Sequence, residues 1–201
     1  MKKRVEILSK QQVFKQAIFA IDEVHLRHQK YNGDMSAELT RLSLDRGDST
    51  AAIIHDPDTD MLVFTEQFRY STYTNGHGWI LEAPAGMIEA GERDDPALSI
   101  RREIQEEIGY TVEEVRHIST FYLSPGGTSE RIFLYYAAVS PKHKTSAGGG
   151  VINEGEDIRV VEIPFREALA MVTRGEIVDA KTIIGLQWMQ LHYPLLRAGR
   201  G

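Results

Sequence analysis

The chain has 201 residues, with 23 Lys and Arg against 29 Asp and Glu, a formal net charge of −6 and no cysteine. The acidic balance argues against binding of long nucleic-acid tracts, which needs many basic side chains, and the lack of cysteine excludes disulfide, thiol and cysteine–zinc chemistry. No apolar run has the length of a membrane helix and the N-terminus lacks a signal-peptide core, so we expect a cytoplasmic protein without membrane or nucleic-acid partners.

The N-terminal part carries strand signals. Residues 18–26 and 39–44 alternate apolar and polar side chains, and Asn32-Gly33 between them is typical of a hairpin turn. We therefore expect residues 1–46 to form a small antiparallel sheet, which is too small to be stable alone. Residues 47–201 are long enough for the main domain.

Strand and helix patterns are mixed along the rest of the chain. Strands are expected at residues 51–55, 61–68, 79–82, 115–122 and 132–139, and helices at residues 165–174 and 181–192. This order predicts an α/β fold with a mixed sheet that helices cover on both faces.

The helix expected between residues 96 and 108 has the most informative pattern. Asp95 can cap it, Pro96 suits its first position and Gly109 suits a left-handed end. Positions three and four apart lie side by side on a helix, so three glutamates project from one face beside a stripe of isoleucines. The three acids are Glu103, Glu106 and Glu107.

Such clustered acids have two interpretations, a solvated acidic face or a cation-binding site. By itself, a solvated acidic face would be the commoner one. Two carboxylates about 4 Å apart, however, repel by roughly 4 kcal/mol at an effective dielectric near 20, so a compensating cation is expected where the acids face a site. Magnesium suits hard oxygen ligands, and one or two carboxylates plus substrate phosphates are its usual shell.

The stretch from Gly86 to Tyr110 resembles the signature of the Nudix hydrolases. It has the glycine, the glutamate six positions later at Glu92, and then the run Arg-Glu-Ile-Gln-Glu-Glu-Ile-Gly that starts at Arg102. One spacing departs from the family pattern, because nine residues rather than seven separate Glu92 from Arg102. A loop before the helix absorbs such an insertion cheaply, so the helix should be unharmed, and we assign no role to Glu92.

The resemblance implies an α/β/α sandwich and a metal-dependent hydrolase. Glu103 and Glu107, with the backbone carbonyl of Ala85, are the implied ligands of Mg²⁺ or Mn²⁺. Glu106 completes the cluster as an implied catalytic residue, and Gly86 is an implied substrate contact. When bound, the metal would neutralise the charge of a diphosphate and lower the pKa of a water.

Three segments outside this stretch resemble the same family and narrow the range of expected substrates. Residues 124–131 place a proline 15 positions beyond Tyr110, like the marker of ADP-ribose pyrophosphatases, and make Glu130 a candidate contact to the terminal ribose. A tight turn is the plainer alternative for this segment. Arg69, at the end of an expected strand, is the implied contact to the diphosphate, for which its forked donors are suited.

The third segment is a loop with three consecutive glycines at residues 148–150, followed by acids. Exposed acids in such a loop usually serve solubility. Here they resemble an element that ADP-ribose pyrophosphatases bring over the active site, in which Glu154 would be the general base and Glu156 a further metal ligand. A triple-glycine loop also resembles the branches that cleave GDP-mannose and UDP-glucose.

The sequence therefore leads to a Mg²⁺-dependent pyrophosphatase of nucleoside diphosphate sugars, with ADP-ribose as the first substrate to test. A GDP-mannose or UDP-sugar pyrophosphatase is the alternative within the enzyme class. A Nudix-fold sensor that binds nucleotide sugars without cleaving them is the alternative from another class, although the paired glutamates and the missing DNA-binding extension speak against it. The resemblance also implies a homodimer that forms through the N-terminal sheet.

Overall fold

The computed structural model describes residues 3–198, without the side chains of residues 90, 154, 197 and 198. Internal contacts divide the chain into two compact units. The first runs to Asp48 and includes Tyr122–Arg131, and the second comprises Ser49–Phe121 and continues from Ile132. Across the described residues, no helix combines the length and the apolar character that crossing a membrane requires.

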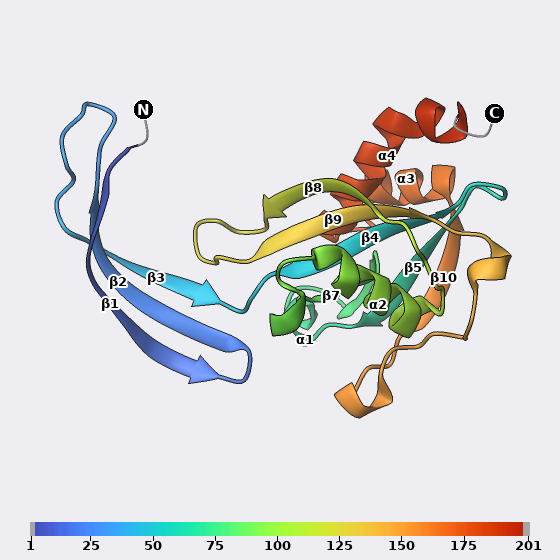
Figure 1. Ribbon diagram of the computed structural model, residues 1–201, viewed down its shortest axis with the longest axis horizontal. Coiled ribbons are helices and arrows are strands. Elements are labelled where there is room, and N and C mark those ends of the chain that lie inside the picture. The colour runs from blue at the N-terminus through green and yellow to red at the C-terminus, as the bar shows by residue number, and fades with distance from the viewer. Residues whose placement is uncertain (1–2, 199–201) are drawn as a thin grey trace. The chain divides into compact units, whose positions relative to one another are not determined.

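The first unit is built on a three-stranded antiparallel sheet, drawn in blue in Figure 1. Its strands, in spatial order, are β1 (Val5–Gln16), β2 (Phe19–His28) and β3 (Leu39–Asp45). The loop at 122–131 pairs with the end of β3, since the Leu44 amide donates to the Gly127 carbonyl at 2.9 Å and the Ser129 amide donates to the Leu44 carbonyl at 3.1 Å. The sequence had not assigned this loop to the N-terminal sheet.

The second unit contains a mixed seven-stranded sheet with the path β10-β5-β4-β9-β8, to which β6 and β7 are added beside β5 and β4. The central strand β4 is buried along its whole length and runs parallel to β9 but antiparallel to β5 and β7. The strands of this sheet are β4 (Ser49–Asp56), β5 (Met61–Phe68), β6 (Trp79–Glu82), β7 (Ala85–Met87), β8 (Arg116–Tyr122), β9 (Arg131–Ala138) and β10 (Arg159–Pro164).

Helices cover both faces of this sheet, as the sequence predicts (Figure 1). Alternate residues of β4 point to opposite faces, so Ala52 and Ile54 pack with helix α2, while Ile53 packs with helices α3 and α4. The helices are α1 (Tyr70–Tyr73), α2 (Pro96–Ile108), α3 (Phe165–Arg174) and α4 (Ala180–Ala198), with 3-10 turns η1 (Ala90–Glu92), η2 (Pro141–His143) and η3 (Ile152–Glu154).

Three strands were not expected from the sequence. In β1, register shifts at Ile7/Ser9 and Gln12/Phe14 interrupt the alternation that marks a strand. Strand β7 has only three residues, one of them glycine, and β10 follows directly on the acidic loop. The expected strands and helices are present, with ends that differ by a few residues except at the C-terminal helix, where α4 extends to Ala198.

Candidate active site

Helix α2 has the ends that its sequence predicts. The Asp95 carboxylate accepts a hydrogen bond from the Ala97 amide at 3.2 Å, and Pro96 occupies the first turn. Gly109 ends the helix with φ of 76°, and its amide donates to the Gln105 carbonyl. The apolar stripe of Ile100, Ile104 and Ile108 is fully buried, which fixes the rotation of the helix about its axis.

Two acids of α2 are buried with that stripe. Glu103 and Glu107 are 8% and 1% exposed. Burial raises the pKa of Glu103 to about 7, against the opposing effect of Arg102. Burial also raises the pKa of Glu107 well above its usual range, although a hydrogen bond from the Ala85 amide lowers it. Because burial penalises a charged carboxylate, a further cation beside these residues would favour their ionised forms.

Strand β7 brings its backbone against these acids. The Ala85 amide donates to Glu107 Oε2 at 3.0 Å. A Cβ atom on Gly86 would lie only 2.0 Å from the Glu103 carboxyl group, so only glycine leaves room for that group here. The implied metal ligands Ala85, Glu103 and Glu107 therefore come from two adjoining elements, β7 and α2, and Gly86 is the residue of β7 next to Ala85.

Arg102 is a single cation among four carboxylates. Its Nη1 lies 2.9 Å from Glu103 Oε1 and 3.0 Å from Glu106 Oε2. Its Nη2 lies 3.6 Å from oxygens of Glu89 and Glu92. Glu92 also accepts a hydrogen bond from the Ser99 hydroxyl at 2.6 Å, which ties the loop before α2 to the helix in spite of the two extra residues. Negative charge is in excess around this arginine.

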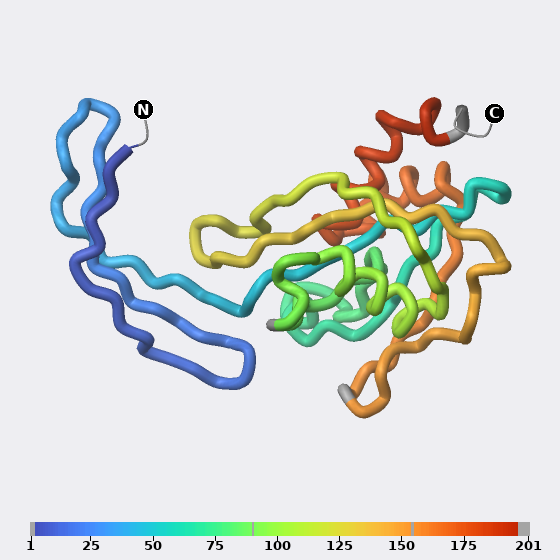
Figure 2. Tube along the Cα trace, in the orientation of Figure 1, coloured from blue at the N-terminus to red at the C-terminus, as the bar shows by residue number. Residues whose placement is uncertain are grey.

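The glycine loop reaches the C-terminal end of α2, and its path can be followed in Figure 2 between the yellow strand β9 and the orange strand β10. The Gly149 amide donates to the Glu107 carbonyl at 2.9 Å, and the Gly150 amide donates to the Glu106 carbonyl at 3.1 Å. Beyond them, Glu156 Oε2 accepts from the Val151 amide at 2.8 Å. Its negative charge raises the pKa of both Glu103 and Glu107, so Glu156 belongs to the same cluster.

The side chain of Glu154, the predicted general base, lies outside the described part of the structure. Glu130 lies in the first unit, where its carboxylate is buried and Oε1 lies 3.6 Å from Arg46 Nη1. The roles assigned to these two residues from the sequence remain predictions.

Arg69 belongs to a network that the sequence did not reveal. Its Nε donates to Glu82 Oε1 at 2.8 Å, and Lys181 Nζ donates to Glu82 Oε2. Glu82 in turn raises the pKa of Glu107, so this network adjoins the acidic cluster. An acid at the end of a short apolar strand, Trp79–Glu82, was a signal for Glu82. Lys181 had none, because it lies 99 positions from its partner.

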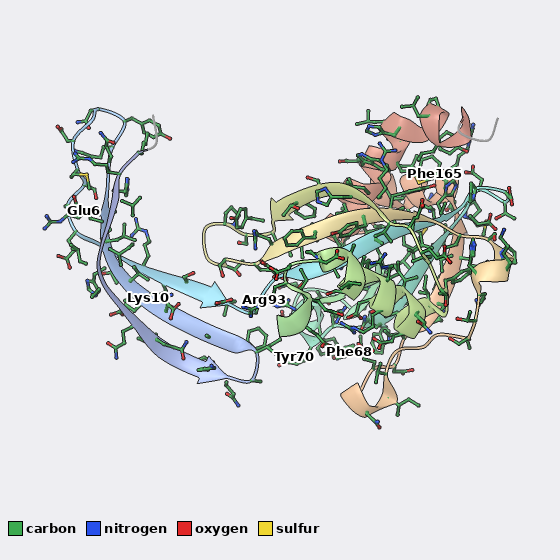
Figure 3. The ribbon with its side chains drawn as sticks, viewed as in Figure 1. Glu6, Lys10, Phe68, Tyr70, Arg93 and Phe165 are labelled. Atoms are coloured by element: carbon green, nitrogen blue, oxygen red, sulfur yellow. The ribbon has the colours of Figure 1, made fainter. Side chains whose placement is uncertain are left out.

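Aromatic side chains flank Arg69 and are not part of the core. The Phe68 ring lies 5.0 Å from that of Trp79 and 5.8 Å from that of Tyr73, measured between centroids. Trp79 and Tyr70 are 51% and 73% exposed. Figure 3 labels Phe68 at the end of β5 and Tyr70 at the start of α1, on either side of Arg69 in the chain.

The donor set fits a divalent cation. Glu103 and Glu107 supply hard carboxylate oxygens, and the glycine at residue 86 leaves room for the Glu103 carboxyl group against the backbone. Among the described side chains, no group of three or more His, Cys, Asp or Glu is arranged to hold a metal ion. Two carboxylates, a backbone carbonyl and substrate phosphates are nevertheless the kind of shell that Mg²⁺ adopts.

Comparison with known proteins agrees with this architecture. A family model described as "NUDIX domain" matches residues 45–186. The chain is 38% identical over 199 residues to the ADP-ribose pyrophosphatase of Escherichia coli (strain K12), covering 98% of this chain and 92% of the relative.

Two further similarities stand beside that one. The chain is 41% identical over 160 residues to the GDP-mannose pyrophosphatase of Yersinia pestis (strain Pestoides F), covering 79% of this chain and 78% of the relative. A crystal structure of an ADP compounds hydrolase superposes with a TM-score of 0.72 at 18% identity, covering 96% of this chain and 97% of that one, and shows the shared fold. By its matched domain and its overall sequence identity to these relatives, this chain belongs to the Nudix hydrolases.

Proposed function

We propose that this Nudix hydrolase cleaves the diphosphate of a nucleoside diphosphate sugar, and that ADP-ribose is its substrate, giving AMP and ribose 5-phosphate. The observation that carries the choice is the 38% identity to an ADP-ribose pyrophosphatase over 98% of the chain. The buried carboxylates Glu103 and Glu107 support the chemistry, because they could hold a divalent cation, and Arg69 supports it as a further cation, since a diphosphate needs positive charge around it.

Mg²⁺ is the cofactor that we propose, with Mn²⁺ as its substitute. Glu103, Glu107, Glu156 and the Ala85 carbonyl would hold it. Bound there, a divalent cation supplies positive charge that neutralises the diphosphate and makes water more acidic. The raised pKa of Glu103, about 7, supports this assignment, since a cation favours the ionised form of a buried acid.

The protein's own side chains would divide the remaining work. Arg69 would bind diphosphate oxygens through its planar fork. Glu154 would take the proton of the attacking water, whose oxygen bonds to phosphorus as the bridging P–O bond breaks. Glu106, 3.0 Å from Arg102, would complete the acidic cluster directly or through water, and Glu130 would contact the terminal ribose.

The loop from residue 151 to 157 would bring Glu154 over the diphosphate. The hydrogen bonds of Gly149 and Gly150 to α2 support a hinge beyond the glycines, because they hold the start of the loop on the helix. Closure of such a loop excludes water that would otherwise compete.

GDP-mannose is the second candidate substrate, because identity to the GDP-mannose pyrophosphatase is 41%, though over 79% of the chain. The exposed aromatic residues Tyr70, Tyr73 and Trp79 offer rings on which either base could stack. Choice between adenine and guanine depends on a few hydrogen bonds to the base edge.

A homodimer through the N-terminal sheet is part of the proposal. On β1, the apolar side chains Val5, Ile7, Val13 and Phe14 are all more than 40% exposed. A long edge strand with such side chains invites pairing with another sheet. A second copy of this chain is the partner that we expect.

The substrate is tested by measuring release of mononucleotide from ADP-ribose, GDP-mannose and UDP-glucose side by side, with Mg²⁺ and with a chelator. We expect metal-dependent cleavage with the highest kcat/KM for ADP-ribose. A higher kcat/KM for GDP-mannose would reassign the substrate, and cleavage of none of the three would reject the proposed function.

A further inference from the structure

Four charged side chains form a continuous network. They come from the first turn of α4 and the residue before it, from β6 and from the residue that follows β5. Arg69 Nε and Nη2 each lie 2.8 Å from Glu82 Oε1. Lys181 Nζ donates to the other oxygen, Glu82 Oε2, and also to Asp179 Oδ1 at 3.1 Å. Each oxygen of Glu82 is therefore held by a different cation.

Burial differs along this network. Glu82 and Lys181 are 4% and 9% exposed, whereas the Arg69 side chain is 42% exposed. Burial alone would lower the pKa of Lys181, but Glu82 and Asp179 raise it above its ordinary value, so the ammonium group is charged at neutral pH. The buried end of the network is an ion pair, and its exposed end is the guanidinium of Arg69.

A second connection holds the backbone beside Glu82. The Thr182 hydroxyl accepts a hydrogen bond from the Ala83 amide at 2.8 Å and donates to Asp179 Oδ2 at 2.6 Å. Thr182 and Lys181 are consecutive residues of the first turn of α4. This turn therefore fixes both the side chain of Glu82 and the backbone of the next residue, two positions before Ala85.

We infer that Lys181 is a positioning residue for the diphosphate. By neutralising one side of Glu82, it leaves Arg69 only partly engaged, so that the guanidinium keeps donors and positive charge for an anionic ligand. Without Lys181, Arg69 would be the remaining counter-ion of a buried carboxylate and would be drawn toward it. This inference rests on the proposed function, in which Arg69 binds the diphosphate.

The first test is a double-mutant cycle between Lys181 and Arg69, with ADP-ribose as substrate. Lys181→Met keeps most of the length of the side chain and removes its charge. We expect it to lower kcat/KM about tenfold or more, because small misplacements of a binding group are costly. In the Arg69→Lys background, the same change should cost less than about threefold, since residues that act as a unit are not additive. Lys142→Met, at an exposed lysine of the same unit, is the matched control and should change nothing.

A second variant serves as the control for misfolding. It is needed because Lys181→Met leaves Glu82 buried with Arg69 as its one partner in the network. Lys181→Met combined with Glu82→Gln removes both buried charges together, which proteins tolerate better than the loss of one. We expect this variant to keep the circular dichroism spectrum of the wild type and to regain part of the kcat/KM that Lys181→Met loses, because no unpaired carboxylate then draws Arg69 away from the ligand. Folded Lys181→Met with wild-type kcat/KM, or a double variant with the same loss as Lys181→Met, would overturn the inference.

A measurement of pyrophosphate binding tests this inference separately from the proposed function. Calorimetry with inorganic pyrophosphate and Mg²⁺ needs no cleavage of a nucleotide sugar. We expect Kd to rise about tenfold in Lys181→Met and to stay unchanged in Lys142→Met. If the wild type cleaves no nucleotide sugar but shows this pattern, the proposed function fails and the inference stands. Equal affinity of wild type and Lys181→Met, or no binding by the wild type, would overturn it.

Discussion

The backbone amide of Ala85 donates a hydrogen bond to the carboxylate of Glu107 at 3.0 Å. This bond joins β7 directly to α2, the two elements that carry most of the predicted metal ligands. The same bond partly compensates for burial, because it lowers the pKa of Glu107, which burial raises well above the usual range. One neutral donor is a weak substitute for a cation beside a carboxylate that is 1% exposed. A bound cation would therefore stabilise the ionised form of Glu107.

Replacing Gly86 by alanine should disable the site with little effect on the rest of the fold. Its Cβ would lie 2.0 Å from the Glu103 carboxyl group, so the carboxyl group must move. We expect kcat/KM to fall roughly tenfold to a hundredfold, as when a metal ligand loses its orientation. Gly91→Ala is the matched control, because a Cβ there meets nothing within 4 Å. Equal losses in both variants, measured by steady-state kinetics, would remove the assignment of Glu103.

The stability of the metal-free protein should fall as pH rises from about 4.5 to about 7. Glu103 has a folded-state pKa of about 7 against an ordinary value of 4.5, so between these values the folded state binds more protons than the unfolded state. Stability then decreases with pH, by at most about 3 kcal/mol from this residue.

Thermal unfolding in a chelator from pH 5 to pH 8 measures this slope. Glu103→Gln should flatten it, because an amide does not titrate. Mg²⁺ should oppose the loss of stability with rising pH and should stabilise the wild type most at the higher pH, since the metal binds the ionised carboxylate. An identical pH dependence in wild type and Glu103→Gln would contradict the pKa of about 7.

The N-terminal sheet should be the dimer interface. We expect sedimentation of the wild type at twice the chain mass of 22.7 kDa. Ile7→Lys combined with Phe14→Lys should give monomers, because both side chains are exposed apolar groups of β1, and Lys15→Gln on the same strand should not. Deletion of residues 3–44 should abolish dimerisation and activity together. A wild type that sediments as a monomer, or a deletion variant that stays active, would refute this account.

Helix α2 shows why part of the fold was predictable. Its cap at Asp95, its buried isoleucines and its end at Gly109 all depend on residues within one short segment. Local patterns of this kind are visible in the sequence. The same holds for β4 and β5, whose apolar runs are bounded by turn residues.

The unpredicted features depend on distant pairs. Lys181 and Glu82 meet across 99 positions, and no local pattern indicates that a lysine in the first turn of a helix will be buried. His55 is another case, since one of its partners lies 81 positions away. It is 1% exposed and lies within hydrogen-bond distance of Tyr136 Oη, at 3.0 Å, and Asp60 Oδ1, at 3.1 Å.

Substitution of Glu107 by glutamine tests the central claim, a metal-dependent hydrolase built on buried carboxylates. The amide keeps the size of the side chain but removes the charge that would hold a cation, so kcat for ADP-ribose with Mg²⁺ should fall by about a thousandfold or more. The variant should unfold in chelator at or above the wild-type temperature, because the neutral amide can be buried without first taking up a proton. Glu114→Gln, at an exposed acid, is the control. Near-normal kcat in folded Glu107→Gln would contradict the account.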